Sequence, residues 1–404
     1  MGRVASNALG REHIRFVNQR AVIDAIHRNG QISRSELAIE LRLSASAITA
    51  ITAPFVDEGL VFEAELGTTT TVGRKPILLE INYDHAYVFG AKVTSHSVIT
   101  ALTNLKVEGG ATRIDPLPDL EVETVTRTIA SAAQALRTEA GLPPHKVIGI
   151  GVNLPGIVDH ATGTVRHSPL LGWYGVPFGD HLHERLGLPV LVENDVNALA
   201  AAQAWFGHGH AHRAFLVVTL GRGVGLGIVI DGALYRGPRG GAGEFGHSVV
   251  TQGGDTLESQ LSDSALLERV RARTHALTAD ADSEALTRLA AAGYPVALGV
   301  LHDAGELLGV ALANLVNIFA PSLIVLGGEG MRNAPYLMER ALRTLGTYAF
   351  GDLAEHLEVV VDAWGDDAWA RGAAGLAAAR FLQEAAIPLT AATMHPPNAQ
   401  RRRD

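Results

Sequence analysis

The chain has 404 residues, of which 47% are hydrophobic and 19% are charged, and it contains no cysteine. This length and apolar fraction supply cores for two or three ordinary domains and exclude a disordered, collagen-like or coiled-coil protein. The lack of cysteine also excludes disulfides, thiolate metal sites and a cysteine nucleophile.

Charge is distributed unevenly along the chain. The formal net charge is −9, yet the first 45 residues hold seven arginines against four acidic residues. A basic head on an acidic body predicts that the head meets a polyanion. The polar first 18 residues do not resemble a signal peptide, and the apolar stretch 309–328 is broken by asparagines and a proline. We therefore expect a cytoplasmic protein with no membrane span.

Three helices are predicted within the first 60 residues. The first spans 17–28 and stops at an Asn-Gly pair. Ser33 and Glu36 form a capping box that starts a short second helix. After a tight turn, a third helix places Ile48, Ile51 and Phe55 inward and ends near residue 59. This order of helices is the plan of a helix-turn-helix module.

The exposed face of the third helix is predicted to read DNA. It carries small hydroxyl and methyl side chains, which allow close approach to base edges: Ala45, Ser46, Thr49, Ala50 and Thr52. Flanking arginines, Arg34 among them, would meet phosphates. A three-helix scaffold for protein contacts is the alternative. Pro54 removes a backbone hydrogen bond, so we expect the third helix to kink or restart there.

A hairpin follows the three helices. Residues 60–63 and 77–81 are predicted strands, and the turn between them ends in a basic tip with Arg74 and Lys75. Such a wing can enter a minor groove. An ordinary solvated hairpin turn explains the same residues equally well.

From residue 87 onward, strands and helices alternate, which predicts an α/β body. Strands are expected at 87–93, 98–103, 147–152, 189–193, 215–220, 225–230 and 323–326, and helices at 122–140, 198–206, 307–319 and 369–384. The tail from residue 388 is expected to be disordered.

Three clusters in the body carry chemistry. Asn194 and Asp195 lie at a strand-to-helix junction and suit the paired hydroxyls of a polyol, although a helix cap explains Asp195 as well. The run 221–227 is rich in glycine and could cradle phosphate, or simply bend a hairpin. Glu244 and His247, followed by Glu258, again suit a hydroxyl-rich ligand, while a structural histidine is the alternative for His247.

Taken in order, the winged helix, Val192–Ala198, Thr219–Gly225 and Gly243–His247 resemble the ROK family of repressors and sugar kinases. The resemblance implies a two-lobed, actin-like sugar-kinase fold behind a winged helix-turn-helix. It also implies that Asn194, Asp195, Glu244, His247 and Glu258 bind sugar, with Asp195 the base in a kinase.

The departures from the family pattern decide between its branches. The kinase motif Asp-x-Gly-Gly-Thr is replaced by Lys92–His96, so Asp195 is expected to be a vestigial base with no catalytic partner. Arg222 replaces a small hydroxyl residue in the glycine-rich loop, and Leu170 replaces an asparagine that contacts sugar. The zinc motif CxCGxxGC is absent, so no structural zinc and no other cofactor is expected.

The sequence thus predicts a sugar-responsive repressor that binds a double-stranded operator as a dimer or tetramer. A carbohydrate kinase with an appended regulatory module is the alternative, and a protein-binding scaffold is a third reading. The expected parts are a flexible basic arm (1–15), the winged helix-turn-helix (16–82), lobe 1 (85–193, completed by a helix at 368–386), lobe 2 (194–367) and the tail (387–404).

Overall fold

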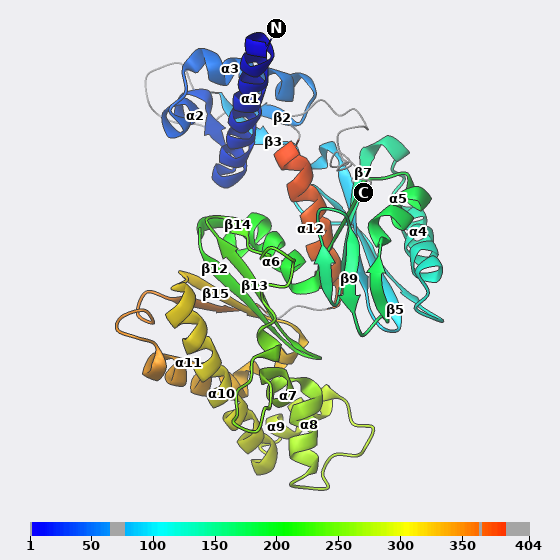
Figure 1. Cartoon of the computed structure of the whole chain (residues 1–404), viewed down its shortest axis with the longest axis vertical. Coiled ribbons are helices and arrows are strands. Elements are labelled where there is room, and N and C mark those ends of the chain that lie inside the picture. Colours follow the sequence, from blue (N-terminus) through cyan, green and yellow to red (C-terminus); the bar gives the residue numbers. More distant parts are fainter. Residues whose placement is uncertain (1, 65–76, 363–365, 385–404) are drawn as a thin grey trace.

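The computed structural model describes residues 2–64, 77–362 and 366–384. It has an N-terminal head and two α/β lobes (Figure 1). The head lies at one end, against lobe 1 and the long C-terminal helix. The wing tip with Arg74 and Lys75 and the tail 387–404 lie outside the described residues.

The head is built of three helices and a small antiparallel sheet with strand order β1-β3-β2. Its elements are α1 (Gly2–Asn29), β1 (Ile32–Ser33), α2 (Arg34–Leu41), α3 (Ala45–Asp57), β2 (Val61–Ala64) and β3 (Leu78–Ile81). The predicted capping box is confirmed, because the Ser33 side chain accepts from the Glu36 amide and the Glu36 side chain accepts from the Ser33 amide.

Two expectations for the head are corrected. Residues 2–15 continue α1 and are not a separate flexible arm, since no proline interrupts 2–29 and Val22, Ile23 and Ile26 anchor the helix in the core. The third helix is continuous through Pro54, so of the two outcomes expected there the restart is wrong. Its apolar face, with Ile48 and Phe55 fully buried, offsets the backbone hydrogen bond that proline cannot make.

Lobe 1 is a five-stranded mixed sheet with order β11-β7-β4-β5-β6. Its strands are β4 (Tyr87–Val93), β5 (Ser97–Asn104), β6 (Thr112–Pro116), β7 (Val147–Leu154) and β11 (Val190–Asn194). The helices α4 (Val122–Glu139) and α5 (Phe178–Leu186) cover one face. A side sheet contains β8 (Ile157–Asp159), β9 (Thr164–Ser168) and β10 (Trp173–Val176).

The other face of this sheet is covered by α12 (Asp366–Glu384). The helix approaches so closely that a Cβ on Gly90 or Gly151 would stand 1.9 Å from a carbonyl oxygen of α12. Glycine at these two strand positions therefore lets the C-terminal helix pack directly on the backbone. Phe381 and Leu382 near the end of α12 are buried in the same core as Val22 and Ile26 of the head.

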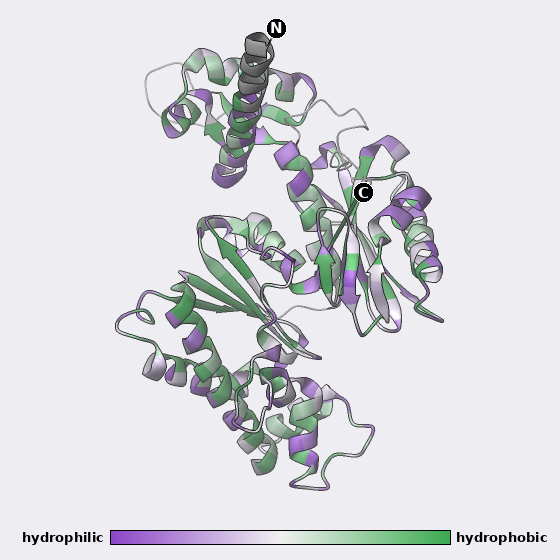
Figure 2. Ribbon diagram, viewed as in Figure 1, coloured by the Kyte–Doolittle hydropathy of each residue, from purple (hydrophilic) through white to green (hydrophobic). Residues whose placement is uncertain are grey.

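Lobe 2 has a second five-stranded sheet, ordered β14-β13-β12-β15-β16, whose apolar strands stand out in Figure 2. The strands are β12 (Phe215–Leu220), β13 (Val224–Ile230), β14 (Ala233–Leu234), β15 (Leu323–Gly327) and β16 (Glu358–Val361). The helices are α6 (Asp195–Phe206), α7 (Leu257–Leu261), α8 (Asp263–Arg271), α9 (Ser283–Ala291), α10 (Pro295–Phe319) and α11 (Ala334–Tyr348).

The predicted helix at 307–319 is the second half of α10, which begins earlier, at Pro295. By length and composition α10 could cross a bilayer, but its apolar side chains lie in the core of lobe 2 against α8 and α11. It is therefore the central helix of that lobe. Short 3-10 turns connect several elements: η1 (Tyr83–His85), η2 (Pro144–Lys146), η3 (His208–Ala211), η4 (Phe245–His247) and η5 (Glu329–Asn333).

Candidate functional site

The junction between β11 and α6 lies where the two lobes meet. Asn194 is the N-cap of α6, and its side-chain oxygen accepts from the amides of Val196 and Asn197 at 3.0 and 3.2 Å. Its Nδ2 donates to the Gly156 carbonyl. The cap that the sequence considered for Asp195 is thus made by Asn194, whose side-chain hydrogen bonds all go to the protein.

Asp195 is held by a lysine from lobe 1. The Lys92 Nζ lies 2.6 Å from Asp195 Oδ2, and the side chains are only 11% and 19% exposed. Lys92 also stands over the ring of Trp369, 4.7 Å from its centroid, at the start of α12. Lys92 therefore supplies the counter-ion of Asp195, a pairing that the sequence did not predict.

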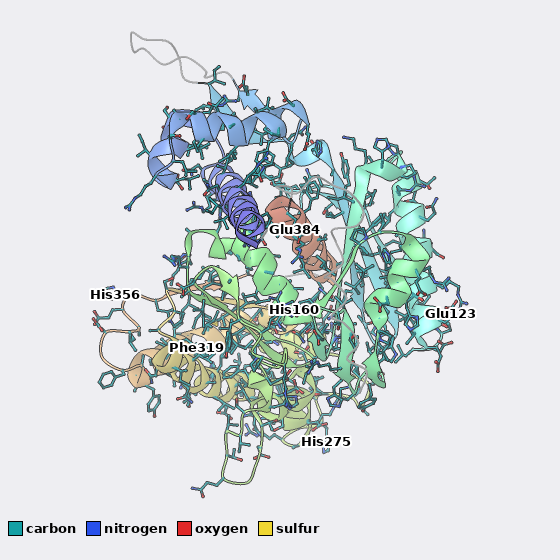
Figure 3. All side chains as sticks on the ribbon, turned by 45° about the horizontal axis from the view of Figure 1, so that its top comes forward. Glu123, His160, His275, Phe319, His356 and Glu384 are labelled. Atoms are coloured by element: carbon teal, nitrogen blue, oxygen red, sulfur yellow. The ribbon has the colours of Figure 1, made fainter. Side chains whose placement is uncertain are left out.

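A second buried ion pair crosses between the lobes. Glu193, 2% exposed at the end of β11, accepts from the Arg236 Nε at 2.6 Å. Its other oxygen accepts from the Asn194 amide and from Asn197. His160 lies beside this pair, where Figure 3 shows it near the middle of the molecule, and burial lowers its pKa. In the sequence, the sign that Glu193 has a role is that a charged residue stands within an otherwise apolar strand.

The predicted acidic groups come together around Asp195. Burial raises the pKa of Glu244, and the negative charges of Asp195 and Glu258 add to this effect, whereas His247 and His167 oppose it. The His247 ring is mostly exposed and lies 3.9 Å from a Glu244 oxygen. Glu244 therefore lies close enough to Asp195 and Glu258 to feel both charges, and the sugar-binding role expected of these residues stays a prediction.

The loop between His247 and Glu258 is ordered by its own hydrogen bonds. Thr251 Oγ1 donates to Asp255 Oδ2 at 2.8 Å and accepts from the Asp255 amide, while Val249 and Thr256 form an isolated bridge. Among the described residues, no group of three or more His, Asp or Glu side chains is placed to hold a metal ion. The Thr251–Asp255 closure explains how this loop stays in place with the residues present.

The glycine-rich hairpin is explained by packing. A Cβ on Gly225 or Gly227 would stand 2.4–2.5 Å from side-chain carbons of α6, so these glycines let β13 lie against that helix. At the turn, the Val224 amide donates to Glu258 and the Gly221 amide donates to the Gly223 carbonyl. Arg222 is exposed there. Of the two sequence readings, the structure supports the bent hairpin.

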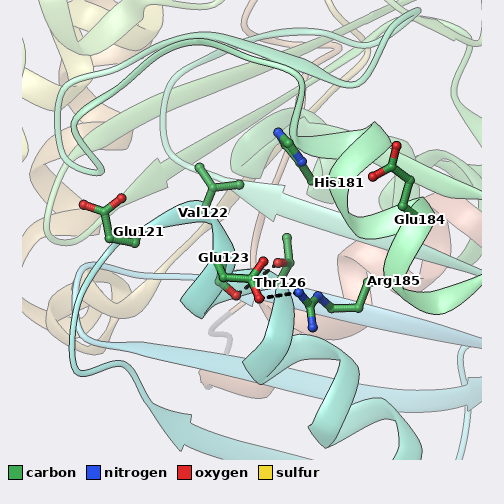
Figure 4. A pocket seen from close by; sticks show the side chains of 7 residues that line it. All are labelled: Glu121, Val122, Glu123, Thr126, His181, Glu184 and Arg185. Carbon is green, nitrogen blue, oxygen red and sulfur yellow. Dashed lines mark hydrogen bonds and ion pairs between the residues drawn. The ribbon is translucent and has the colours of Figure 1, made fainter.

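A separate surface cavity of about 610 Å³ lies between α4 and α5, where Figure 4 shows charged side chains around it. It opens on the face of lobe 1 opposite α12 and is lined by exposed acids, His181 and Arg185. None of the predicted ligand residues contributes to it. Leu170, which the sequence analysis singled out, is 56% exposed on lobe 1.

On the head, α3 presents part of the predicted DNA face. Ala45, Ser46 and Thr49 are exposed, as expected. Thr52 is wrong as a DNA contact, because it is fully buried: its Oγ1 donates to the Ile48 carbonyl and accepts from Arg34. Thr52 lies seven positions after Ala45 and therefore on the same side of α3. Arg34 packs over that part of the helix, so Thr52 is not exposed.

Arg34 itself is tied to the protein. Its guanidinium lies 2.8 Å from the Glu63 carboxylate in β2, and its side chain is 27% exposed. This pair joins α2 to the first strand of the wing. Arg34 lies at the edge of the predicted DNA face, where the Glu63 carboxylate would compete with a DNA phosphate for its guanidinium.

The head is joined to the body by His27, near the end of α1. Its Nδ1 pairs with the Tyr83 hydroxyl and its Nε2 with the Trp205 carbonyl, both at 2.7 Å. The ring stacks on Trp205 with centroids 4.8 Å apart and meets Phe206 edge-on. Burial lowers the pKa of His27 to about 4. The C-terminal end of α6 thus contacts the DNA-binding head.

Comparisons with known proteins agree with this architecture. The profile of the ROK family matches residues 101–380, and that of a winged helix-turn-helix DNA-binding module matches residues 17–61. The xylose repressor of Bacillus subtilis is 27% identical over 380 residues, covering 91% of this chain and 97% of the repressor.

Two solved structures illustrate both branches of the fold. The crystal structure of a ROK family transcriptional regulator, a homologue of the Escherichia coli Mlc protein, covers 93% of this chain and 99% of its own, with a TM-score of 0.80 and 26% identity. A ROK family glucokinase from Streptomyces griseus, in complex with glucose and AMPPNP, covers 72% of this chain and 99% of its own, with a TM-score of 0.63 and 26% identity.

Proposed function

Because the chain belongs to the ROK family and carries an N-terminal winged helix-turn-helix, we propose that it is a sugar-responsive transcriptional repressor. It binds a double-stranded operator through its head and a small carbohydrate through its body. The support is the combination of a winged helix-turn-helix with a ROK body along one chain, together with the similarity to the xylose repressor of Bacillus subtilis over 91% of this chain and 97% of that protein.

The proposal includes the absence of sugar phosphorylation. A kinase base must accept a proton from the attacking hydroxyl, but Asp195 already accepts a hydrogen bond from the Lys92 ammonium. Two amides of the glycine-rich turn are bonded within the protein, that of Val224 to Glu258 and that of Gly221 to the Gly223 carbonyl. These pairings support a ligand site in which Asp195 binds sugar hydroxyls and does not act as the base of a phosphoryl transfer.

The DNA surface that we propose is centred on Ala45, Ser46 and Thr49 at the N-terminal half of α3. Arg34 flanks it, and Arg74 and Lys75 of the wing extend it, as the sequence predicts. One recognition helix reads few base pairs, so a homo-oligomer, with a dimer as the simplest form, supplies the second half-site. Such a protein acts where the DNA lies, in the cytoplasm.

Two helices could carry the response from the sugar site to the head. The N-terminal end of α6 holds Asn194 and Asp195, and its other end holds Trp205 against His27, about 18 Å away for 12 residues. Beside it, α12 carries Trp369 under Lys92 near its N-terminal end and Phe381 in the core of the head near its C-terminal end. A shift at the sugar site therefore reaches the head without unfolding either lobe.

The proposal is tested by DNA binding in the presence of sugars. Labelled DNA from upstream of the gene is titrated with purified protein, and fluorescence anisotropy is followed with and without a panel of mono- and disaccharides. We expect a sequence-preferring complex whose affinity falls steeply with salt and changes at least tenfold with one sugar. Thr49→Glu should weaken the complex, while Thr138→Glu, the same change on an exposed position of α4, should not.

The kinase alternative is tested on the same preparation. ADP release is measured with ATP, Mg²⁺ and each sugar of the panel, for the wild type and for Asp195→Asn. No sugar-dependent ADP release is expected. Turnover that disappears in Asp195→Asn would favour the kinase, and DNA binding without sequence preference would contradict the repressor.

A further inference from the structure

The hydrogen-bonding groups left around Asp195 are mostly acceptors, and this bears on what the site can bind. Two cationic side chains of the inter-lobe region form ion pairs with carboxylates that are largely buried: Lys92 pairs with Asp195, and Arg236 pairs with Glu193. Glu244 has His247 at 3.9 Å and His167 within electrostatic range, and Glu258 accepts one backbone amide. The described cluster therefore has an excess of negative charge.

A buried acceptor lies beside this cluster. Asn153 of β7 is fully buried and is the direct sheet neighbour of Lys92. Its Nδ2 donates to the Trp369 carbonyl, whereas its Oδ1 has no hydrogen-bond partner. An unpaired buried oxygen is destabilising until a donor reaches it. Asn153 therefore adds an unpaired acceptor, and no cation, next to Lys92.

The positive end of α6 could argue for an anionic ligand, since helix N-termini attract phosphate. Here the Asn194 side chain accepts from the amides of Val196 and Asn197, and Asp195 Oδ1 accepts from the Val196 amide as well. With these amides bonded to the protein, the helix end offers little to a phosphate.

We propose, on the basis of the sugar site proposed above, that the effector is an uncharged sugar that donates hydroxyl hydrogen bonds, and that the site rejects sugar phosphates. A phosphate dianion brings acceptor oxygens only, and it would face Glu244 and Glu258. The phosphate could form an ion pair with Lys92 only if Lys92 left Asp195. The Asp195 carboxylate would then be unpaired and mostly buried, which costs free energy. Free hydroxyls meet no such obstacle, because each can donate to a carboxylate.

The test compares each sugar with its own phosphate ester. Full-length protein is titrated calorimetrically with glucose and glucose 6-phosphate, mannose and mannose 6-phosphate, and N-acetylglucosamine and its 6-phosphate, with xylose as a further neutral probe. Operator release by each compound is recorded in parallel. We expect at least one neutral sugar to bind, and its ester to bind at least tenfold more weakly.

The variant Glu244→Gln removes one of the two repelling charges. It should narrow the gap between sugar and ester severalfold, whereas Glu355→Gln, beside the peripheral His356 of Figure 3, should leave the gap unchanged. An ester that binds as tightly as its parent sugar, or a gap that Glu244→Gln does not narrow, overturns the inference while leaving a sugar-responsive repressor intact. If neither form of any sugar binds or releases DNA, the proposed sugar site itself is wrong, and the inference fails with it.

Discussion

Replacing Lys92 by methionine removes the cation that pairs with Asp195 but keeps a side chain of similar length against Trp369. An exposed ion pair contributes at most about 1 kcal/mol, and removing one partner of a fully buried pair costs about 3–5 kcal/mol. With side chains 11% and 19% exposed and a contact of 2.6 Å, this pair lies nearer the buried limit. We expect Lys92→Met to lower the free energy of unfolding by about 2–3 kcal/mol.

The double variant Lys92→Met/Asp195→Asn separates the lost attraction from the cost of a stranded carboxylate. Because it leaves no unpaired charge, it should be more stable than Lys92→Met alone, by about 1 kcal/mol or more. Urea unfolding followed by tryptophan fluorescence measures all four members of the cycle. A double variant that is no more stable than Lys92→Met would refute the reasoning, because Asp195 would then not depend on Lys92.

Three further predictions follow from single contacts. Arg236→Ala strands Glu193, which is 2% exposed, and should destabilise the protein by about 3 kcal/mol in urea unfolding, with the exposed Arg239→Ala as control. Thr52→Val should lower stability by about 1 kcal/mol and leave operator affinity per folded molecule unchanged, since Thr52 lies inside the head. His27 stays neutral down to about pH 4, whereas the unfolded chain protonates near pH 6.5; stability should therefore fall as pH falls through this window, and His27→Gln should flatten that slope.

Much of the head could be read from local pattern. The capping box at Ser33 and Glu36 satisfies helix amides within four residues of chain, so it forms wherever that segment lies. The inward positions Ile48, Ile51 and Phe55 follow from helical spacing and are buried as predicted. Thr52 was misplaced because helical spacing does not say that Arg34, from another helix, covers that position.

The ligand site also combines features that the sequence predicted with features that only the tertiary structure shows. The motif order predicted that Glu244, His247 and Glu258 belong to one site with Asp195; burial is the main cause of the raised Glu244 pKa, and the charges of Asp195 and Glu258 add to it. The glycines of β13 were ambiguous in the sequence, because a phosphate-binding turn and a close helix contact require the same residue. Only the position of α6 against Gly225 and Gly227 distinguishes the two.

What the sequence determined by itself are the features set by neighbours along the chain: the helix caps, the inward faces, the alternation of strands and helices, and the ordered motifs of the family. What the tertiary structure decided are the pairings of charges and rings far apart in sequence. Lys92 meets Asp195 across 103 positions, and His27 meets Trp205 across 178. Such pairs depend on the register and packing of whole elements, and residue type alone does not select one distant partner among many.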